Sequence, residues 1–134
     1  MNVIDGYLME SDRLAPGDDE ANQRINIDFD GVVHAYSKGF NDGTIYDKPQ
    51  EGTEESLKLL KDKGYNLILF SARINAEDNG KQNIIDWLKK YDLLKYFNGI
   101  TDKKLPSKVI IDDSAVRHNN WSDTLKTLKN LNII

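Results

Sequence analysis

The chain has 134 residues, of which 39% are hydrophobic and 30% charged, and its formal net charge is -4. A chain of this length and composition can bury the core of one domain and leaves no room for a second. The net negative charge argues against a surface that binds nucleic acids in general, so a nucleic acid is expected only as a substrate. The chain contains no cysteine, which excludes disulfides and thiolate metal sites.

The N-terminal segment has neither the charged start nor the apolar run of a signal peptide, and no stretch approaches the ~18 apolar residues of a membrane span. The sequence therefore predicts a soluble, cytoplasmic protein that does not enter a membrane. Within one domain of residues 1–134, we treat residues 1–24 as an N-terminal extension whose structure the sequence does not define. Residues 25–134 form the core.

The most informative stretch is a buried strand near residues 25–29 that ends by presenting two carboxylates, Asp28 and Asp30, with Gly31 directly after them. Side chains alternate along a strand, so these two carboxylates are expected on the same side. Two like charges so close together repel each other. A divalent cation, a lysine or a shared proton would compensate them.

The elements that follow predict a βαβ unit. Two short extended pieces, residues 32–37 and 44–46, suggest a hairpin that forms a flap over the end of the first strand. Thr53 can cap a helix whose apolar stripe is Leu57, Leu59 and Leu60. The apolar run 65–70 then gives a second strand, parallel to the first with a right-handed crossover.

The second half of the chain repeats this alternation. We expect a helix over residues 77–91, a short strand over 99–101 and a buried strand over 109–111. Ser122 can cap a final helix whose apolar face is Leu125, Leu128 and Leu131. The predicted fold class is α/β: a three-layer, Rossmann-like parallel sheet with helices on both faces.

Polar side chains follow three of these strands at the point where each strand ends. The first ends in Asp28 and Asp30, the second in Ser71 and the last in Asp112-Asp113, with Lys104 shortly before the last strand. In open α/β sheets the binding crevice lies beyond the carboxyl ends of the strands. Taken singly each residue is more often a turn residue, a helix cap or a solvated side chain, but together they point to one site.

This combination resembles the four motifs of the haloacid dehalogenase superfamily. The segments that carry the resemblance are Asp28-Phe29-Asp30-Gly31-Val32-Val33, Leu67-Ile68-Leu69-Phe70-Ser71, Lys104 and Val109-Ile110-Ile111-Asp112-Asp113. The pattern also resembles a group of small bacterial and phage hydrolases of that superfamily. Those proteins carry Ser-Thr-Arg where this chain has Ser71-Ala72-Arg73. They also have an adjacent Lys-Pro pair, which Leu105 interrupts here, so that Lys103 is an alternative to Lys104 as the motif lysine.

The resemblance implies phosphoryl transfer. Asp28 would be the nucleophile that attacks phosphorus and forms an aspartyl-phosphate. Asp30 would protonate the leaving oxygen and later deprotonate the attacking water, a role that typically contributes ~10²–10⁴-fold. An acid at position 30 favours phosphate esters over halides, because a halide leaves without a proton.

The resemblance also implies Mg²⁺ as cofactor, with Asp28, the Asp30 backbone carbonyl and Asp113 as ligands. Asp112 is the alternative to Asp113, and the member of the pair that does not bind the metal would orient metal-bound waters or Lys104.

The remaining roles concern the phosphate. Ser71 and the neighbouring backbone amide of Ala72 would bind its oxygens, while Lys104 would balance charge on the phosphoryl group. Arg73 is a candidate for a second anionic group of the substrate, with a surface salt bridge as the alternative.

The spacing between motifs leaves no room for a cap domain, so the expected site is open. Such enzymes act on macromolecules, oligomerise or use short loops to hold substrate. The predicted function is that of a Mg²⁺-dependent phosphatase of a phosphomonoester. One alternative is a nucleotide- or polynucleotide-directed phosphatase or phosphotransferase, and a second is a non-catalytic binding or regulatory module. A response-regulator receiver domain also gathers acidic residues at strand ends, but it lacks the paired aspartates on one strand.

Overall fold

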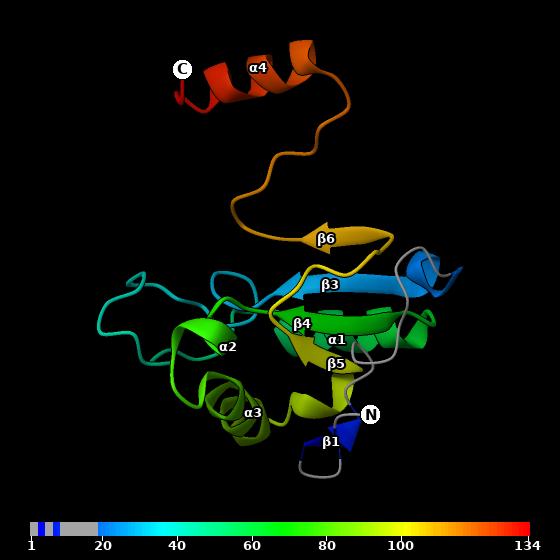
Figure 1. The fold of residues 1–134 in the computed structure, drawn as a ribbon, viewed down its shortest axis with the longest axis vertical. Coiled ribbons are helices and arrows are strands. Elements are labelled where there is room, and N and C mark those ends of the chain that lie inside the picture. The colour runs from blue at the N-terminus through cyan, green and yellow to red at the C-terminus, as the bar shows by residue number, and fades with distance from the viewer. Residues whose placement is uncertain (1–2, 5–6, 9–18) are drawn as a thin grey trace.

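A four-stranded parallel sheet organises the molecule (Figure 1). The computed structural model describes residues 3–4, 7–8 and 19–134, with side chains from residue 21 onward. The strands lie in the order β5-β4-β3-β6. Their bounds are Arg24–Asp28 for β3, Asn66–Phe70 for β4, Gly99–Thr101 for β5 and Val109–Ile111 for β6. The predicted α/β class with a parallel, Rossmann-like sheet is confirmed.

The two central strands pair as the βαβ prediction requires. Ile25 lies opposite Leu67, and Asp28 lies opposite Phe70 at the carboxyl end. They are linked by α1 (Thr53–Asp62), whose Leu57 is buried whereas Leu59 of the predicted stripe is exposed. The N-cap of α1 is Gly52, and the Thr53 hydroxyl instead donates to the Gln50 carbonyl.

Both packed helices belong to one apolar cluster on one face of the sheet. This cluster joins alternate residues of the strands to α1 and to α3 (Gly80–Lys90). Its buried members are Ile25, Ile27, Phe29, Val33, Leu57, Leu67, Leu69, Ile84, Ile85, Trp87, Leu88, Leu93, Phe97 and Ile100. At ~25 cal/mol per Å² of apolar surface, their burial is the main favourable term for the fold.

The opposite face of the sheet is covered by chain rather than by a helix. The Arg24 guanidinium donates to the Pro106 carbonyl at 2.5 Å, and the Asn26 amide donates to the Leu105 carbonyl at 2.6 Å. Both side chains are buried. The segment between β5 and β6 is therefore held flat across this face by polar side chains of β3.

The last strand and last helix differ from the prediction. Val109, Ile110 and Ile111 pair with β3 but are 36–41% exposed, because β6 is the sheet edge and no described helix covers it. Helix α4 (Trp121–Asn130) lies apart from the sheet at the end of an extended connection (Figure 1). The predicted helices on both faces are thus not formed by the described residues. The N-cap of α4 is Asn120, not Ser122, and its side chain accepts from the Asp123 amide.

The predicted hairpin after β3 is wrong in detail. Residues 29–52 form no strand, but the chain closes on itself where the Ala35 amide donates to the Lys48 carbonyl and the Gln50 amide to the Val33 carbonyl. We call residues 36–47, which project beyond this closure, the flap loop. Side chains hold the loop together: the Ser37 hydroxyl donates to Asp47, and the Tyr46 hydroxyl to the Gly39 carbonyl.

The predicted helix over residues 77–91 forms, but it begins three residues later than expected. A single turn, α2 (Arg73–Ala76), precedes α3, and α3 begins only at Gly80. A Cβ on Gly80 would lie 2.8 Å from the carbonyl carbon of Arg73, so only glycine allows this close packing of the two helices.

The remaining elements are short. A 3-10 turn, η3 (Leu94–Tyr96), leads into β5, another, η2 (Asp19–Gln23), leads into β3, and β1 (Val3–Ile4) pairs with β2 (Tyr7–Leu8) as a hairpin. The rest of the N-terminal extension, residues 1–2, 5–6 and 9–18, lies outside the described residues. None of the described helices has the length and apolar composition that a membrane crossing needs.

Candidate functional site

Three carboxylates meet at the carboxyl end of β3. Each of Asp28, Asp112 and Asp113 offers an oxygen within 4.8 Å of those of the other two. Asp28 ends β3, and the other two follow β6, which pairs with β3 in parallel. Parallel strands put their carboxyl ends at one edge, so the sheet itself brings these residues together. The predicted meeting of Asp28 with the Asp112-Asp113 pair is therefore present.

Local contacts fix the two members of the pair in different ways. The Asp113 carboxylate packs against the backbone of Gly31, where a Cβ would lie 2.7 Å from Asp113 Cγ. Gly31 also has φ +83°, a backbone region that L side chains rarely adopt. Asp112 Oδ1 accepts from the amide of Ser114 at 2.8 Å and from its hydroxyl at 3.0 Å. Contacts with Gly31 and Ser114 therefore orient the carboxylates of Asp113 and Asp112, respectively.

The pKa of Asp28 is raised to about 6. Burial is the largest cause, and the negative charge of Asp112 follows; the amide of Phe29, which donates to Asp28, acts in the opposite direction. Asp113 and Asp30 add smaller repulsions. The repulsion expected from the sequence is real, but its main source is the pair after β6 rather than Asp30.

Asp30 lies in a separate charge environment. Since β3 ends at Asp28, Asp30 falls in the turn that follows and is not a member of the three-carboxylate group. Its Oδ2 accepts from Arg73 Nε at 2.8 Å and its Oδ1 from His34 Nδ1 at 2.8 Å. Although burial raises the pKa of Asp30, hydrogen bonds from His34 and Arg73 outweigh it and hold the pKa below its usual value. Asp30 is therefore ionised at neutral pH.

The contact between His34 and Asp30 was not predicted from the sequence. The residue lies in a stretch that resembles an ordinary strand, and a lone histidine among apolar residues carries no signal of its own. Its ring is fully buried beside Phe29, Tyr36, Tyr46 and Trp87. The spacing of four residues between Asp30 and His34 gives contact only because the chain turns sharply after β3.

Arg73 faces inward. Its side chain is 6% exposed, and besides Asp30 it donates from Nη1 to the Gly43 carbonyl at 2.7 Å and to Glu77 at 3.3 Å. The alternative, a surface salt bridge, does not describe this buried side chain, while the second anion site stays a prediction. The guanidinium instead joins Asp30 to the flap loop.

The other predicted residues lie at the same edge. Ser71 is buried at the end of β4, and its Oγ accepts from the Arg73 amide at 3.2 Å, while Ala72 is exposed. Lys104 is exposed, with its ammonium 5.5 Å from the ring centroid of Phe70, the residue opposite Asp28. Among the described residues Lys104 forms no ion pair with Asp28.

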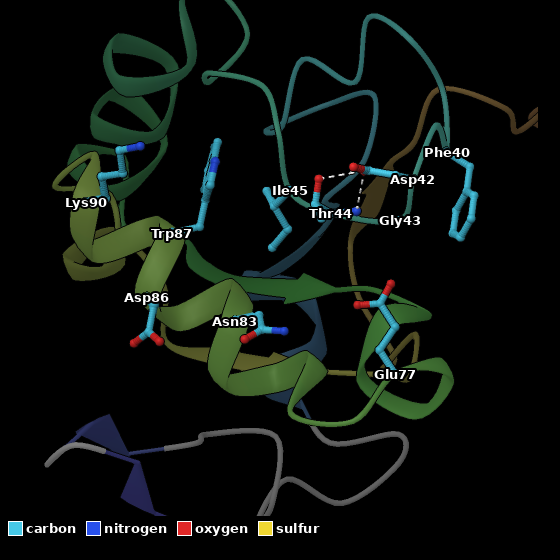
Figure 2. A pocket seen from close by; sticks show the side chains of 10 residues that line it. All are labelled: Phe40, Asp42, Gly43, Thr44, Ile45, Glu77, Asn83, Asp86, Trp87 and Lys90. Atoms are coloured by element: carbon cyan, nitrogen blue, oxygen red, sulfur yellow. Dashed lines mark hydrogen bonds between the residues drawn. The ribbon is translucent and has the colours of Figure 1, made fainter.

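An open cavity of about 750 Å³ lies beside this edge, between the flap loop and α3 (Figure 2). Gly43, the carbonyl partner of Arg73, belongs to its wall, so the cavity begins one side chain away from Asp30. Trp87 contributes the apolar floor and donates from Nε1 to the Asp47 carbonyl at 3.0 Å. The wall carries three carboxylates, from Asp42, Glu77 and Asp86, and one ammonium, from Lys90.

The donor set fits a hard divalent cation. Three carboxylates supply only oxygen ligands, which suit Mg²⁺ or Ca²⁺ rather than thiolate-seeking metals. Among the described residues no ammonium or guanidinium forms an ion pair with Asp28, Asp112 or Asp113. Burial and the negative charge of Asp112 raise the pKa of Asp28, and a bound cation would offset the repulsion among the three carboxylates.

Comparisons of the chain with protein-family models, with curated proteins and with solved structures each found no match.

Proposed function

We propose that this protein is a Mg²⁺-dependent phosphatase of the haloacid dehalogenase type that hydrolyses a phosphomonoester through an aspartyl-phosphate on Asp28. The observation that supports this most directly is the pairing of two environments at one sheet edge. Asp28 lies with Asp112 and Asp113 in a group suited to a cation, and Asp30 lies beside it, bonded to Arg73 and His34.

In this proposal Mg²⁺ would be held by the carboxylates of Asp28 and of Asp113 or Asp112 and by the Asp30 backbone carbonyl, and it would supply positive charge beside the phosphate. A carboxylate oxygen of Asp28 attacks phosphorus, and the bond from phosphorus to the leaving oxygen breaks; that oxygen takes a proton from the protonated form of Asp30 or, if it is a good leaving group, departs without one. Ser71, the Ala72 amide and Lys104 bind the phosphate oxygens. Water then attacks the aspartyl-phosphate, loses a proton to Asp30 and releases inorganic phosphate with a free Asp28 carboxylate.

Because its pKa is lowered, Asp30 is better suited to act as a general base than as a general acid. The ionised carboxylate is ready to accept the proton of the attacking water, whereas it must first gain a proton to protonate a leaving alkoxide. Substrates whose leaving group departs without a proton, such as aryl phosphates, are therefore expected to turn over faster than alkyl phosphates.

The test is hydrolysis of p-nitrophenyl phosphate by the purified protein with Mg²⁺ and with EDTA. We expect turnover that disappears on chelation and in Asp28→Asn, with a loss of at least ~10³-fold for the variant. Asp62→Asn, which changes an exposed carboxylate at the end of α1 that pairs with Lys58, is the control and should keep the wild-type rate. Turnover in EDTA, or an active Asp28→Asn variant, would contradict the mechanism.

A panel of sugar phosphates, nucleotides and phosphorylated oligonucleotides then separates the alternatives. Preference for a nucleotide or oligonucleotide would favour the nucleic-acid-directed phosphatase, and phosphoryl transfer to an added alcohol would favour the phosphotransferase. Mg²⁺ binding by calorimetry without turnover of any compound would favour the non-catalytic module.

A further inference from the structure

The tautomer of His34 follows from its two partners. The backbone amide of Asp47 donates to His34 Nε2 at 3.1 Å, and an amide nitrogen can only donate. Nε2 must therefore carry a lone pair, which puts the ring proton of a neutral His34 on Nδ1. That proton points at Asp30 Oδ1, 2.8 Å away.

The surroundings hold this arrangement in place. The ring is fully buried, stacks on Phe29 at a centroid distance of 5.5 Å and meets the edges of Tyr36 and Tyr46. A rotation that broke either hydrogen bond would leave a buried polar group without a partner, which is energetically unfavourable. The ring is thus a fixed connector between one carboxylate and the end of the flap loop.

Arg73 makes the same connection from the other side. Its Nε bonds to the second oxygen of Asp30, and its Nη1 bonds to the Gly43 carbonyl within the flap loop. Both oxygens of Asp30 are therefore bonded to side chains that also hold the flap loop, one at Asp47 and one at Gly43.

We propose that His34 is a positioning residue: its Nδ1–H sets the orientation of the Asp30 carboxylate, and its Nε2 holds the end of the flap loop at Asp47. This inference rests on the proposed function for its kinetic part. It assigns the two ring nitrogens separate effects, on turnover through Nδ1 and on the loop through Nε2.

Two substitutions test the contacts of His34 Nδ1 and Nε2 separately. In His34→Asn the side-chain amide can donate from the position of Nδ1 but does not reach Asp47. In His34→Gln the amide oxygen can accept from the Asp47 amide at the position of Nε2, but no donor remains for Asp30. Both variants lose the ring from the same buried site, so each is the stability control for the other.

We expect each variant to change a different readout: kcat, measured with p-nitrophenyl phosphate and Mg²⁺, in His34→Gln, and hydrogen exchange in His34→Asn. His34→Gln should lose kcat by ~10-fold or more with little change in KM, and His34→Asn should keep kcat within ~3-fold of the wild type. Hydrogen exchange at the Asp47 amide, followed by NMR, should be ~10-fold faster in His34→Asn and unchanged in His34→Gln. Equal losses of kcat in both variants, in step with their melting temperatures, would overturn the proposal.

A readout that does not depend on activity tests the tautomer itself. The chain has two histidines, so the ¹⁵N spectrum of a His118→Gln variant reports on His34 alone. A protonated Nδ1 with a bare Nε2 is expected, and the opposite tautomer would overturn the assignment. If the tautomer is as expected and the wild type still turns over no phosphate ester, the proposed function has failed, and His34 is a structural residue only.

Discussion

At the scale of single residues, the site depends on how charge is distributed between neighbouring positions. Asp28 faces two other carboxylates, whereas Asp30, two residues later, faces a guanidinium and an imidazole N–H. Burial raises the pKa of both, but the partners move them apart, to about 6 for Asp28 and below the usual range for Asp30. Such divergence is typical of sites that divide a reaction between two carboxylates.

Asp28→Asn should stabilise the metal-free protein at pH 7.5. The folded pKa of about 6 exceeds the ordinary 3.8, so the folded state binds the proton more tightly and loses stability as the pH rises from about 4 to 6. The substitution removes that loss, which we put at roughly 1 kcal/mol because the half-exposed carboxylate is screened by solvent. Thermal melts in EDTA should show the variant above the wild type at pH 7.5 and level with it below about pH 4. A variant that melts lower at pH 7.5 would contradict this.

Gly31→Ala should weaken Mg²⁺ binding. Its Cβ would collide with the Asp113 carboxylate and push it away from Asp28. Gly39→Ala is the matched control, because Gly39 also has a positive φ, +63°, but a Cβ there meets no atom within 4 Å. Calorimetry should show a loss of ~10-fold or more in Mg²⁺ affinity for the first variant and none for the second, while both lose about 1 kcal/mol of stability from backbone strain. Equal affinities would mean that Asp113 does not bind the metal.

At the scale of elements, the strands and helices predicted from the sequence were most accurate where apolar runs are long. The parallel strands and the meeting of Asp28 with Asp112-Asp113 follow from such runs and from the rule that parallel strands end at one edge. The flap loop was misread as a hairpin because side-chain bonds, such as those of Ser37 and Thr44 to aspartates, replace the backbone ladder that strands would form. The partners of Asp30 were not predictable, because they depend on how the turn after β3 is folded.

The break between α2 and α3 gives a prediction at this scale. Gly80→Ala should lower the free energy of unfolding by about 1–3 kcal/mol, because the new Cβ collides with the Arg73 backbone in a packed site. Gln82→Ala, on the exposed side of α3, should have an effect within about 0.5 kcal/mol. Chemical denaturation measures both. If the two variants were equally stable, the close packing of α2 on α3 would not contribute to the fold.

At the scale of the whole molecule, α4 is separate from the packed part of the chain. Leu125 and Leu131, which the sequence placed on one apolar face of the final helix, are exposed, and that helix lies apart from the sheet (Figure 1). Periodicity alone shows that a helix has an apolar face, but it does not show what that face contacts. For this reason the helix itself was predictable and the third layer was not.

Truncation after Arg117 should therefore leave the sheet intact. Since the helix lies apart from the sheet, we expect the melting temperature of residues 1–117 to stay within about 4 °C of the full chain, a shift that corresponds to less than about 1 kcal/mol. Differential scanning calorimetry measures this, and a substitution of Leu125 by Ser in the full chain should likewise leave the transition unchanged. A drop of 10 °C or more would show that α4 packs on the sheet in solution.

The fluorescence of the two tryptophans reports on different parts of the molecule. Trp87 is buried against the flap loop and bonded to the Asp47 carbonyl, whereas Trp121 at the start of α4 is 68% exposed. The emission of Trp87 should be blue-shifted and shielded from iodide, while that of Trp121 should be red-shifted and readily quenched. With Trp121 replaced by Phe, the remaining fluorescence becomes an intrinsic signal of flap-loop seating that needs no attached dye. Substrate or cation binding at the sheet edge could then be followed in real time on the unlabelled chain.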